Sequence, residues 1–184
     1  MLDKHLGGHN GLTHLDEGAL KWLQSLGHKR FLDIGCGPGG MVQLAEQLGF
    51  VVKGIDGDHT LERYDPQKFI IHDFQIGPAP IDDIYDIGWS VEFVEHVYEK
   101  YIPNYAHAMQ KCKNLIMTHA VVGQTGYHHV NCQNAPYWID KMTEYGFTLD
   151  QEKTKQLRIE STMGKKKKHR FLEKTGMYFV NEKL

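Results

Sequence analysis

The stretch Phe31-Leu-Asp-Ile-Gly-Cys-Gly-Pro-Gly-Gly40 joins a short apolar run directly to a loop of glycines. Its first residues are types that favour β-strands. The glycines can adopt positive φ or let a ligand approach the backbone closely. From Met41 to Leu48 the apolar residues recur at three- and four-residue spacing, which predicts a helix. The stretch therefore predicts a strand, a glycine turn and a helix N-terminus, whose free N–H groups suit a nucleotide-like cofactor with an acidic group.

Asp33 indicates which cofactor this loop would bind. It lies within the apolar run, two residues before the first glycine. The first strand of a doubly wound sheet is usually covered on both faces, so a carboxylate there is costly without a partner. Gly35, Gly37 and Gly40 match the Gly-x-Gly-x-x-Gly spacing of dinucleotide sites, which alone is weak evidence. Asp33 would repel a pyrophosphate and attract an ammonium group, so a nicotinamide dehydrogenase is disfavoured.

The segment Leu-Asp-Ile-Gly-Cys-Gly-Pro-Gly resembles the first motif of class I S-adenosylmethionine (SAM) methyltransferases. In that family the loop cradles the methionine end of SAM, so the resemblance implies a Rossmann-like fold and this cofactor. It assigns cofactor contacts to Asp33, Gly35, Cys36, Gly37 and Pro38. Other segments, such as Trp-Ser-Val-Glu-Phe-Val-Glu-His, look like a group of short uncharacterised methyltransferase-like proteins from marine and phage sequences. The wider similarity covers nearly the whole chain but implies no acceptor.

Length and composition are consistent with one soluble domain over residues 1–184. The net charge is −2, so no strong overall field favours nucleic acid. The three cysteines form no Cys-x-x-Cys pair and indicate free thiols in a reducing compartment. The sequence shows neither a secretory signal pattern nor an apolar run long enough to span a membrane. We therefore expect a cytoplasmic protein without a membrane partner.

Strand-like and helix-like patterns alternate, which predicts an α/β fold with a mostly parallel seven-stranded sheet and helices on both faces. Pro103 is expected to end or kink part of the third long helix. The segment 73–83 contains Gly77, Pro78 and Pro80 and is too broken for a helix, but its extended length suffices to cross to the sheet centre. Strands are expected at 31–34, 50–55, 69–72, 84–89, 115–118, 147–149 and 177–180, and helices at 16–26, 41–48, 94–111 and 135–145.

Ligands of open α/β sheets bind beyond the carboxyl ends of the strands. Asp56 ends the second strand 21 residues after Gly35, close to the offset at which an acid binds ribose hydroxyls, and Gly57 follows it. The resemblance gives Asp56 this role and assigns Asp73 to the adenine amino group and Phe74 to the ring. It also places Ser90 and Val91 near the adenosine, whereas Trp89 fits core packing equally well.

The acceptor chemistry depends on two polar clusters that follow strand ends. If the first is helical, Glu92, Glu95 and His96 share one face, and adjacent carboxylates repel unless a cation lies between them. The second contains His128 and His129. Glu-x-x-Glu-His with a later histidine resembles the divalent-metal site of small-RNA 3′-end 2′-O-methyltransferases and a segment of ubiquinone-biosynthesis O-methyltransferases. The residues leave three alternatives: a metal site that would take Mg²⁺, base catalysis by His128, His129 or Glu92, and a helix start that is solvated or adjacent to the cofactor.

Several functions remain open at this stage. The leading hypothesis is methyl transfer to an O or N atom of a small-molecule or sugar-like acceptor, because no separate substrate-recognition domain is evident. The alternatives are an RNA 2′-O-methyltransferase and a non-catalytic SAM-binding subunit. The run Gly164 to Arg170 contains four lysines but fits a solvated loop or helix face better than a phosphate contact. The glycine-rich residues 1–14 form a lid over the cofactor or a disordered tail.

Overall fold

The computed structural model describes residues 2–164 and 169–184, which form one seven-stranded sheet. The strand order is β3-β2-β1-β4-β5-β7-β6, with β7 antiparallel to both of its neighbours and the other neighbouring pairs parallel. The expected mostly parallel sheet is therefore confirmed. The strands are β1 (Arg30–Ile34), β2 (Val51–Asp56), β3 (Phe69–Ile71), β4 (Tyr85–Ser90), β5 (Cys112–Met117), β6 (Phe147–Leu149) and β7 (Met177–Asn181).

The direction in which successive strands join the sheet reverses between β3 and β4. The first three strands run outward from the centre to one edge, and the chain then returns so that β4 pairs with the other side of β1. The connecting residues 72–84 contain no helix, as the glycine and prolines predicted. This connection still contributes Phe74, Ala79 and Ile81 to the buried core. The switch point therefore lies between β1 and β4, where the glycine loop begins.

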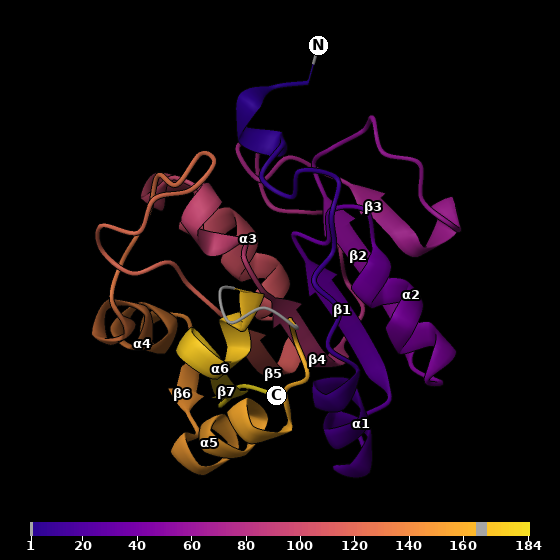
Figure 1. The fold of residues 1–184 in the computed structure, drawn as a ribbon, viewed down its shortest axis with the longest axis vertical. Coiled ribbons are helices and arrows are strands. Elements are labelled where there is room, and N and C mark those ends of the chain that lie inside the picture. Colours follow the sequence, from indigo (N-terminus) through magenta and orange to yellow (C-terminus); the bar gives the residue numbers. More distant parts are fainter. Residues whose placement is uncertain (1, 165–168) are drawn as a thin grey trace.

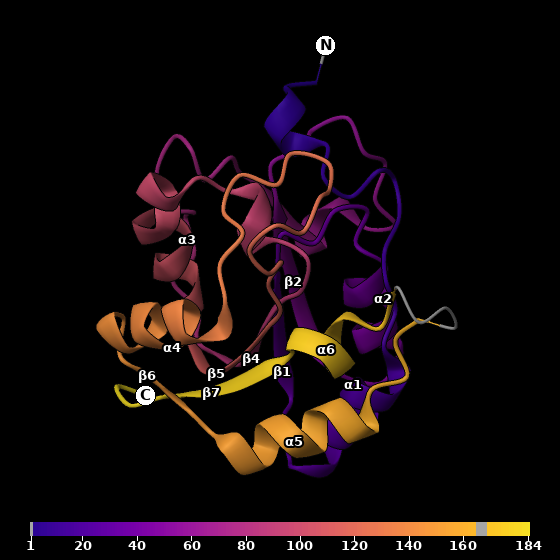
Figure 2. The ribbon, with the colours of Figure 1, turned by 60° about the vertical axis from the view of Figure 1, so that its left-hand side comes forward.

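Helices cover both faces of the sheet (Figures 1 and 2). One core cluster joins α3 and α4 to Leu32 and Ile34 of β1, while Phe31 of the same strand packs into the other cluster, with α1, α2 and α5. This opposition follows from the two-residue alternation of side chains along a strand. The helices are α1 (Glu17–Ser25), α2 (Gly40–Gln47), α3 (Ile102–Met109), α4 (Ala135–Glu144), α5 (Gln151–Glu160) and α6 (Phe171–Thr175).

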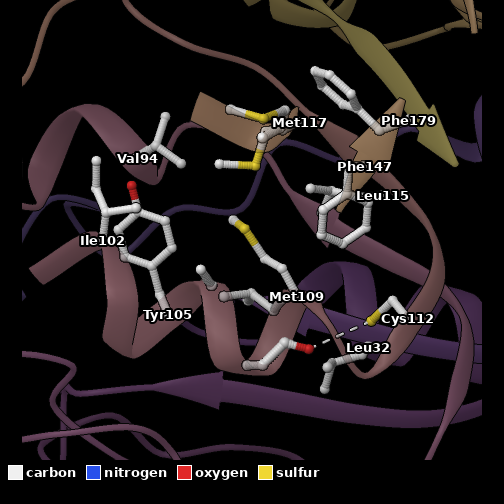
Figure 3. Close-up of a cluster of buried hydrophobic side chains, with 14 of the residues drawn as sticks. Leu32, Val94, Ile102, Tyr105, Met109, Cys112, Leu115, Met117, Phe147 and Phe179 are labelled. Carbon is white, nitrogen blue, oxygen red and sulfur yellow. Dashed lines mark hydrogen bonds between the residues drawn. The ribbon is translucent and has the colours of Figure 1, made fainter. Parts of the chain in front are cut away.

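The core on the α3 face is rich in sulfur and aromatic side chains (Figure 3). Met109 of α3 points toward Leu115 and Met117 of β5, whereas the ring of Tyr105 lies beside Val94, and all five residues are fully buried. Flexible methionines fill the irregular gaps between the rings. This packing fixes α3 against the sheet, and it holds Val94, just after β4, in the same cluster. The polar residues that follow β4 are thus attached to a rigid base.

The expected helix over 94–111 is wrong in its first half. The structure has separate 3₁₀ turns at Val94–His96 and Glu99–Tyr101, and α3 begins only at Ile102. Pro103 lies in the first turn of α3, where its missing N–H is not needed, so it starts a helix instead of ending one. Helices α5 and α6 were not predicted from the sequence. Lys165–Lys168, the lysines of the basic run, lie outside the described residues.

Asp16 connects the first helix to a distant segment of the chain. It is fully buried, and its Oδ1 accepts hydrogen bonds from the N–H of Ala19 at 2.9 Å and of Thr162 at 2.9 Å. The Ser161 hydroxyl donates to its Oδ2. The carboxylate therefore caps α1 and fixes the chain that leaves α5.

Among the described residues, no helix is long and apolar enough to cross a membrane.

We expect Asp16→Ala to lower the free energy of unfolding by roughly 2–4 kcal/mol, because it removes a cap and leaves buried donors without a partner. Asp150→Ala is the matched control, since Asp150 caps α5 through the Lys153 N–H at 2.8 Å but is partly exposed. This control should lose about 1 kcal/mol. Urea unfolding followed by circular dichroism measures both. An equal loss in the two variants would contradict the linking role of Asp16.

Candidate active site

The glycine loop between β1 and α2 leaves its backbone bare where the neighbouring chain comes closest. Gly35 has φ of 80°, and a Cβ added there would lie 2.2 Å from the ring of Phe93. Gly39 caps α2 in the left-handed region, with φ of 86°. The N–H groups of Gly35 and Cys36 both donate to the carbonyl of Ile55, at 2.8 and 3.1 Å. The loop is thus held on β2, and larger residues would not fit its conformation.

Two carboxylates flank this loop in a desolvated setting. Asp33 is 3% exposed, and burial, together with the nearby Asp56, raises its pKa well above the usual range. Burial also raises the pKa of Asp56, although the N–H groups of Asp58 and Gly37 and the charge of Arg63 oppose this. A cation placed between the loop and these carboxylates would stabilise their ionised forms. The pair thus favours a positively charged ligand.

Arg63 organises the side of the site that is expected to hold the ribose, and it was missed in the sequence. Its Nε donates to the carbonyl of Gly37 at 3.2 Å, and its Nη1 donates to the carbonyl of Asp58 at 3.1 Å. Its Nη2 lies 3.5 Å from Oδ1 of Asp56, while the N–H of Gly37 donates to Oδ2 at 2.8 Å. One nearly buried guanidinium therefore ties the glycine loop to the acid after β2. It follows β2 in an irregular segment, which leaves no periodic signal to find it.

Two adjoining cavities lie over the ends of β1, β2 and β4. The smaller, of about 70 Å³, is lined by Asp56, Asp73 and Phe74, and the larger, of about 350 Å³, is lined by Asp33, Cys36 and Val91. Gly35, Glu92 and His96 belong to both. The structure thus brings most of the expected cofactor residues to one place. Ser90 is fully buried beneath it, and Pro38 and Gly57 line neither cavity.

Residues 2–14, named here the N-terminal strap, cross this site (Figure 1). Nε2 of His5 lies 2.9 Å from Oδ2 of Asp73. Nδ1 of His9 accepts from the N–H of Gly11 at 2.8 Å, so its Nε2 carries the proton and donates to Oδ2 of Asp58 at 3.0 Å. Leu6 packs against Gly57, where an added Cβ would lie 2.4 Å from it. The strap therefore contacts Asp73, the acid expected to bind adenine, and Asp58, which was not predicted and lies two residues after Asp56.

Glu95, His96 and His129 offer ligand atoms that all lie within 4.8 Å of one another. The N–H groups of Val130 and Asn131 donate to the backbone carbonyl of Glu95 at 2.9 and 3.1 Å, which draws the segment after β5 beside the turn after β4. The three residues are defined here as the Glu/His cluster. The metal prediction named Glu92, Glu95 and His96 on one helical face. The structure instead groups Glu95 and His96 with His129, on a 3₁₀ turn and a loop.

The electrostatics of the Glu/His cluster suit a bound cation. Both oxygens of Glu95 are buried and accept from no N–H or alcohol donor among the described residues; their neighbour is the Glu92 carboxyl. Burial, and then the Glu92 charge, raise the pKa of Glu95. Burial, and then His129, lower the pKa of His96 to about 4, so its imidazole is neutral at pH 7. Its Nδ1 has no partner among the described residues. Nδ1 of His129 lies 3.1 Å from the carbonyl of Gln124, which leaves its Nε2 as the free lone pair.

The remaining predicted catalytic residues are separated by the fold. Glu92 lines both cavities, has a positive φ of 56°, and has a pKa raised to about 7 by burial. His128 points elsewhere, with its ring 5.7 Å from the ring of Tyr98 and 6.4 Å from that of His5, and it lines neither cavity. Of the two adjacent histidines, the geometry therefore favours His129 for chemistry at the cavity. Two neighbours in sequence could not be told apart without the backbone.

The chain is similar to known methyltransferases, although no protein-family model matches it. It is 31% identical over 117 residues to a ubiquinone biosynthesis O-methyltransferase of Paraburkholderia phymatum, which is 57% of this chain and 48% of that protein. The chain thus spans about half the length of this curated relative. The match extends the sequence similarity beyond the first motif.

Solved structures share the fold. The magnesium protoporphyrin IX methyltransferase of Synechocystis PCC 6803 with bound SAH superposes with a TM-score of 0.61 at 17% identity, covering 90% of this chain and 81% of that one. A TehB-like SAM-dependent methyltransferase of Corynebacterium glutamicum gives 0.59 at 15% identity, over 72% and 74%. The chain therefore has the fold of class I SAM-dependent methyltransferases.

We expect Arg63→Lys to weaken SAH binding roughly tenfold, the usual effect of removing a side chain that orients a ligand contact. Lysine keeps the charge but cannot donate to Gly37 and Asp58 while facing Asp56. Calorimetric titration with SAH measures the change. Arg30→Lys is the control, because Arg30 pairs with the exposed Asp83 at the opposite end of β1 and its replacement should leave the affinity unchanged. Unaltered SAH affinity in Arg63→Lys would refute the role.

Proposed function

We propose that this protein, which has the class I SAM-dependent methyltransferase fold, transfers the methyl group of SAM to a hydroxyl oxygen of a small acceptor with the help of a divalent metal. The observation that carries the proposal is the Glu/His cluster beside the glycine loop, since His96 and Gly35 line the same two cavities. The cofactor part rests on Asp33, Asp56 and the bare loop, which together favour a ligand with a cationic amino-acid end and a ribose.

The Glu/His cluster fits a metal by its chemistry. Glu95 is a buried carboxylate that accepts from no N–H or alcohol donor among the described residues, and His96 and His129 both hold imidazole nitrogens with free lone pairs. Two imidazoles beside one carboxylate favour Mn²⁺, Co²⁺ or Zn²⁺ over the Mg²⁺ expected from the sequence, because Mg²⁺ prefers oxygen ligands. When bound, such an ion would acidify the acceptor hydroxyl. The carbonyl of Gln124 fixes the ring of His129 from behind, as hydrogen-bonded partners of metal ligands do.

Glu92 has the position and the proton affinity of a general base. It lines both cavities, and its pKa of about 7 lets it accept a proton at neutral pH. Thr118 holds it: the Thr118 hydroxyl accepts from the Glu92 N–H at 2.9 Å and donates to Oε1 at 3.4 Å. In the transfer, the C–S bond of the sulfonium breaks and an O–CH₃ bond forms. The hydroxyl proton passes to Glu92, leaving SAH and a methyl ether.

A small acceptor agrees with the size of the site. The larger cavity has a volume of about 350 Å³, within the range of small-molecule pockets. The lysines at 165–168, which would favour RNA binding, lie outside the described residues and do not contribute to the proposal. We also propose a cytoplasmic location, because the three cysteines are free and two of them are buried, as is usual in a reducing compartment.

The experiment is a methyl-transfer assay with radiolabelled SAM over a panel of hydroxylated acceptors, including short RNA 3′ ends. We expect chelation to abolish transfer and Mn²⁺ or Co²⁺ to restore it more fully than Mg²⁺. Glu95→Gln should lower the rate at least a hundredfold at unchanged SAH affinity, because it removes the anionic ligand and keeps the shape. Glu99→Gln is the control, since Glu99 is exposed and its carboxylate accepts from the Tyr137 hydroxyl at 2.8 Å. Full activity of Glu95→Gln in chelator would refute the metal.

The N-terminal strap acts, in this proposal, as the lid of the cofactor site. With the strap in place, the cavity between Asp56, Asp73 and Phe74 holds only about 70 Å³, less than a nucleoside needs. The imidazole of His5 is also within hydrogen-bond distance of the Asp73 carboxylate, to which the resemblance assigns the adenine amino group. Residues 2–11 of the strap must therefore move for SAM to enter, while Thr13 at its end stays bonded to Gly40. These residues can then close over the bound cofactor.

We expect SAH to slow amide exchange at residues 7–11, because a closed strap exchanges only when it opens. His9→Ala should speed SAH dissociation several-fold, since it removes the hydrogen bond to the buried Asp58. His59→Ala is the control, because His59 is exposed in the same loop. Hydrogen exchange by mass spectrometry and stopped-flow release give the two readouts. Equal exchange with and without SAH would exclude the lid.

A further inference from the structure

Three flat side chains form one wall of the larger cavity. His14 ends the strap, and His169 and Phe171 come from the chain that enters α6. The ring of His14 lies 5.2 Å from that of His169 and 4.8 Å from that of Phe171. His169 and Phe171 are stacked at an interplanar angle of 26°. Figures 1 and 2 both show the strap passing beside the start of α6. These three residues are defined here as the aromatic shelf.

The shelf is neither ordinary core nor a charged surface. All three side chains are partly exposed and line the cavity. Burial, and then His169, lower the pKa of His14, so its ring is uncharged at neutral pH. Aromatic rings that line a cavity offer a surface on which another flat ring can stack.

The shelf is held firmly in place. Asp16, two residues after His14, bonds to Thr162, and the N–H of Gly40 donates to the hydroxyl of Thr13 at 3.2 Å. On the other side, Leu172 is fully buried beside Phe171. Because both segments that carry the shelf are fixed by their neighbours, the shelf can orient a ligand with little loss of conformational entropy on binding.

The same cavity carries the reacting groups. His96 and His129 of the Glu/His cluster line it, as do Glu92 and the methionine-side residues Asp33 and Gly35. An acceptor in this cavity therefore meets the shelf with one part and the Glu/His cluster with another. From this arrangement we infer that the acceptor is a hydroxylated flat-ring compound, whose ring stacks on His14, His169 and Phe171 while its hydroxyl faces the Glu/His cluster. The inference rests on the proposed function and names its substrate class.

The test compares catechol, whose ring is flat, with cis-cyclohexane-1,2-diol, whose ring is puckered. Because catechol is also the more acidic diol and the better metal ligand, both are titrated into the SAH-saturated protein with and without Mn²⁺, and binding is followed by calorimetry. We expect catechol to bind and the saturated diol to bind at least tenfold more weakly. Phe171→Ala should weaken catechol binding roughly three- to tenfold, and Phe171→Tyr should restore it, because tyrosine keeps the ring. His169→Ala serves as a second variant.

Each outcome decides the proposal. Cytidine forms a further arm: if it binds more tightly than catechol with the same dependence on Phe171, the flat ring is a base and the shelf stands. Equal binding of the two diols, an equal effect of Phe171→Ala on both, or no binding of catechol and cytidine would overturn it. SAH affinity is measured in every variant, and Ile159→Ala, on the exposed face of α5, is the control. Failure of SAH to bind the wild-type protein would refute the proposed function instead of the shelf.

Discussion

The site depends on keeping two carboxylates close together out of water. Asp33 lies on the central strand and Asp56 at the end of the next, and burial raises the pKa of both. Such a pair is unfavourable in the ligand-free protein, and it becomes favourable when a cation arrives. Arg63 offsets part of this cost on the ribose side only. Asp33 has no such cation beside it, so this side of the site still favours a positively charged group, such as the SAM ammonium expected there.

The fold was predictable where the signal is local. The glycine turn, the helix after it, the strand ends and the irregular 72–84 connection all follow from residue types over short windows. The region after β4 was not, because Glu92 takes a left-handed conformation that its sequence does not announce, and this breaks the helical spacing of Glu95 and His96. From sequence alone, Pro103 is compatible with ending a helix or with starting one, and in the structure it lies in the first turn of α3.

The site was predictable in residue types and less so in grouping. Asp33, Asp56 and Asp73 could be placed because strand ends converge at one edge of a parallel sheet. The pairing of Glu95 with His129 depends on backbone hydrogen bonds between segments 35 residues apart, from Asn131 and Val130 to Glu95. The contacts of Arg63 with Gly37 and of His14 with Phe171 likewise join residues far apart in the sequence. Contacts of this kind require the tertiary structure.

The two ends of the cofactor site are supported by unequal scaffolding. Asp33 sits in β1, which is bonded to strands on both sides, whereas Asp73 and Phe74 belong to the helix-free connection that begins beyond the short edge strand β3. Segments with few ladder hydrogen bonds open at lower free-energy cost than central strands. A bound nucleoside would consequently loosen before the amino-acid portion does. Product departure would then follow a fixed order, peeling from the rim of the sheet toward its middle.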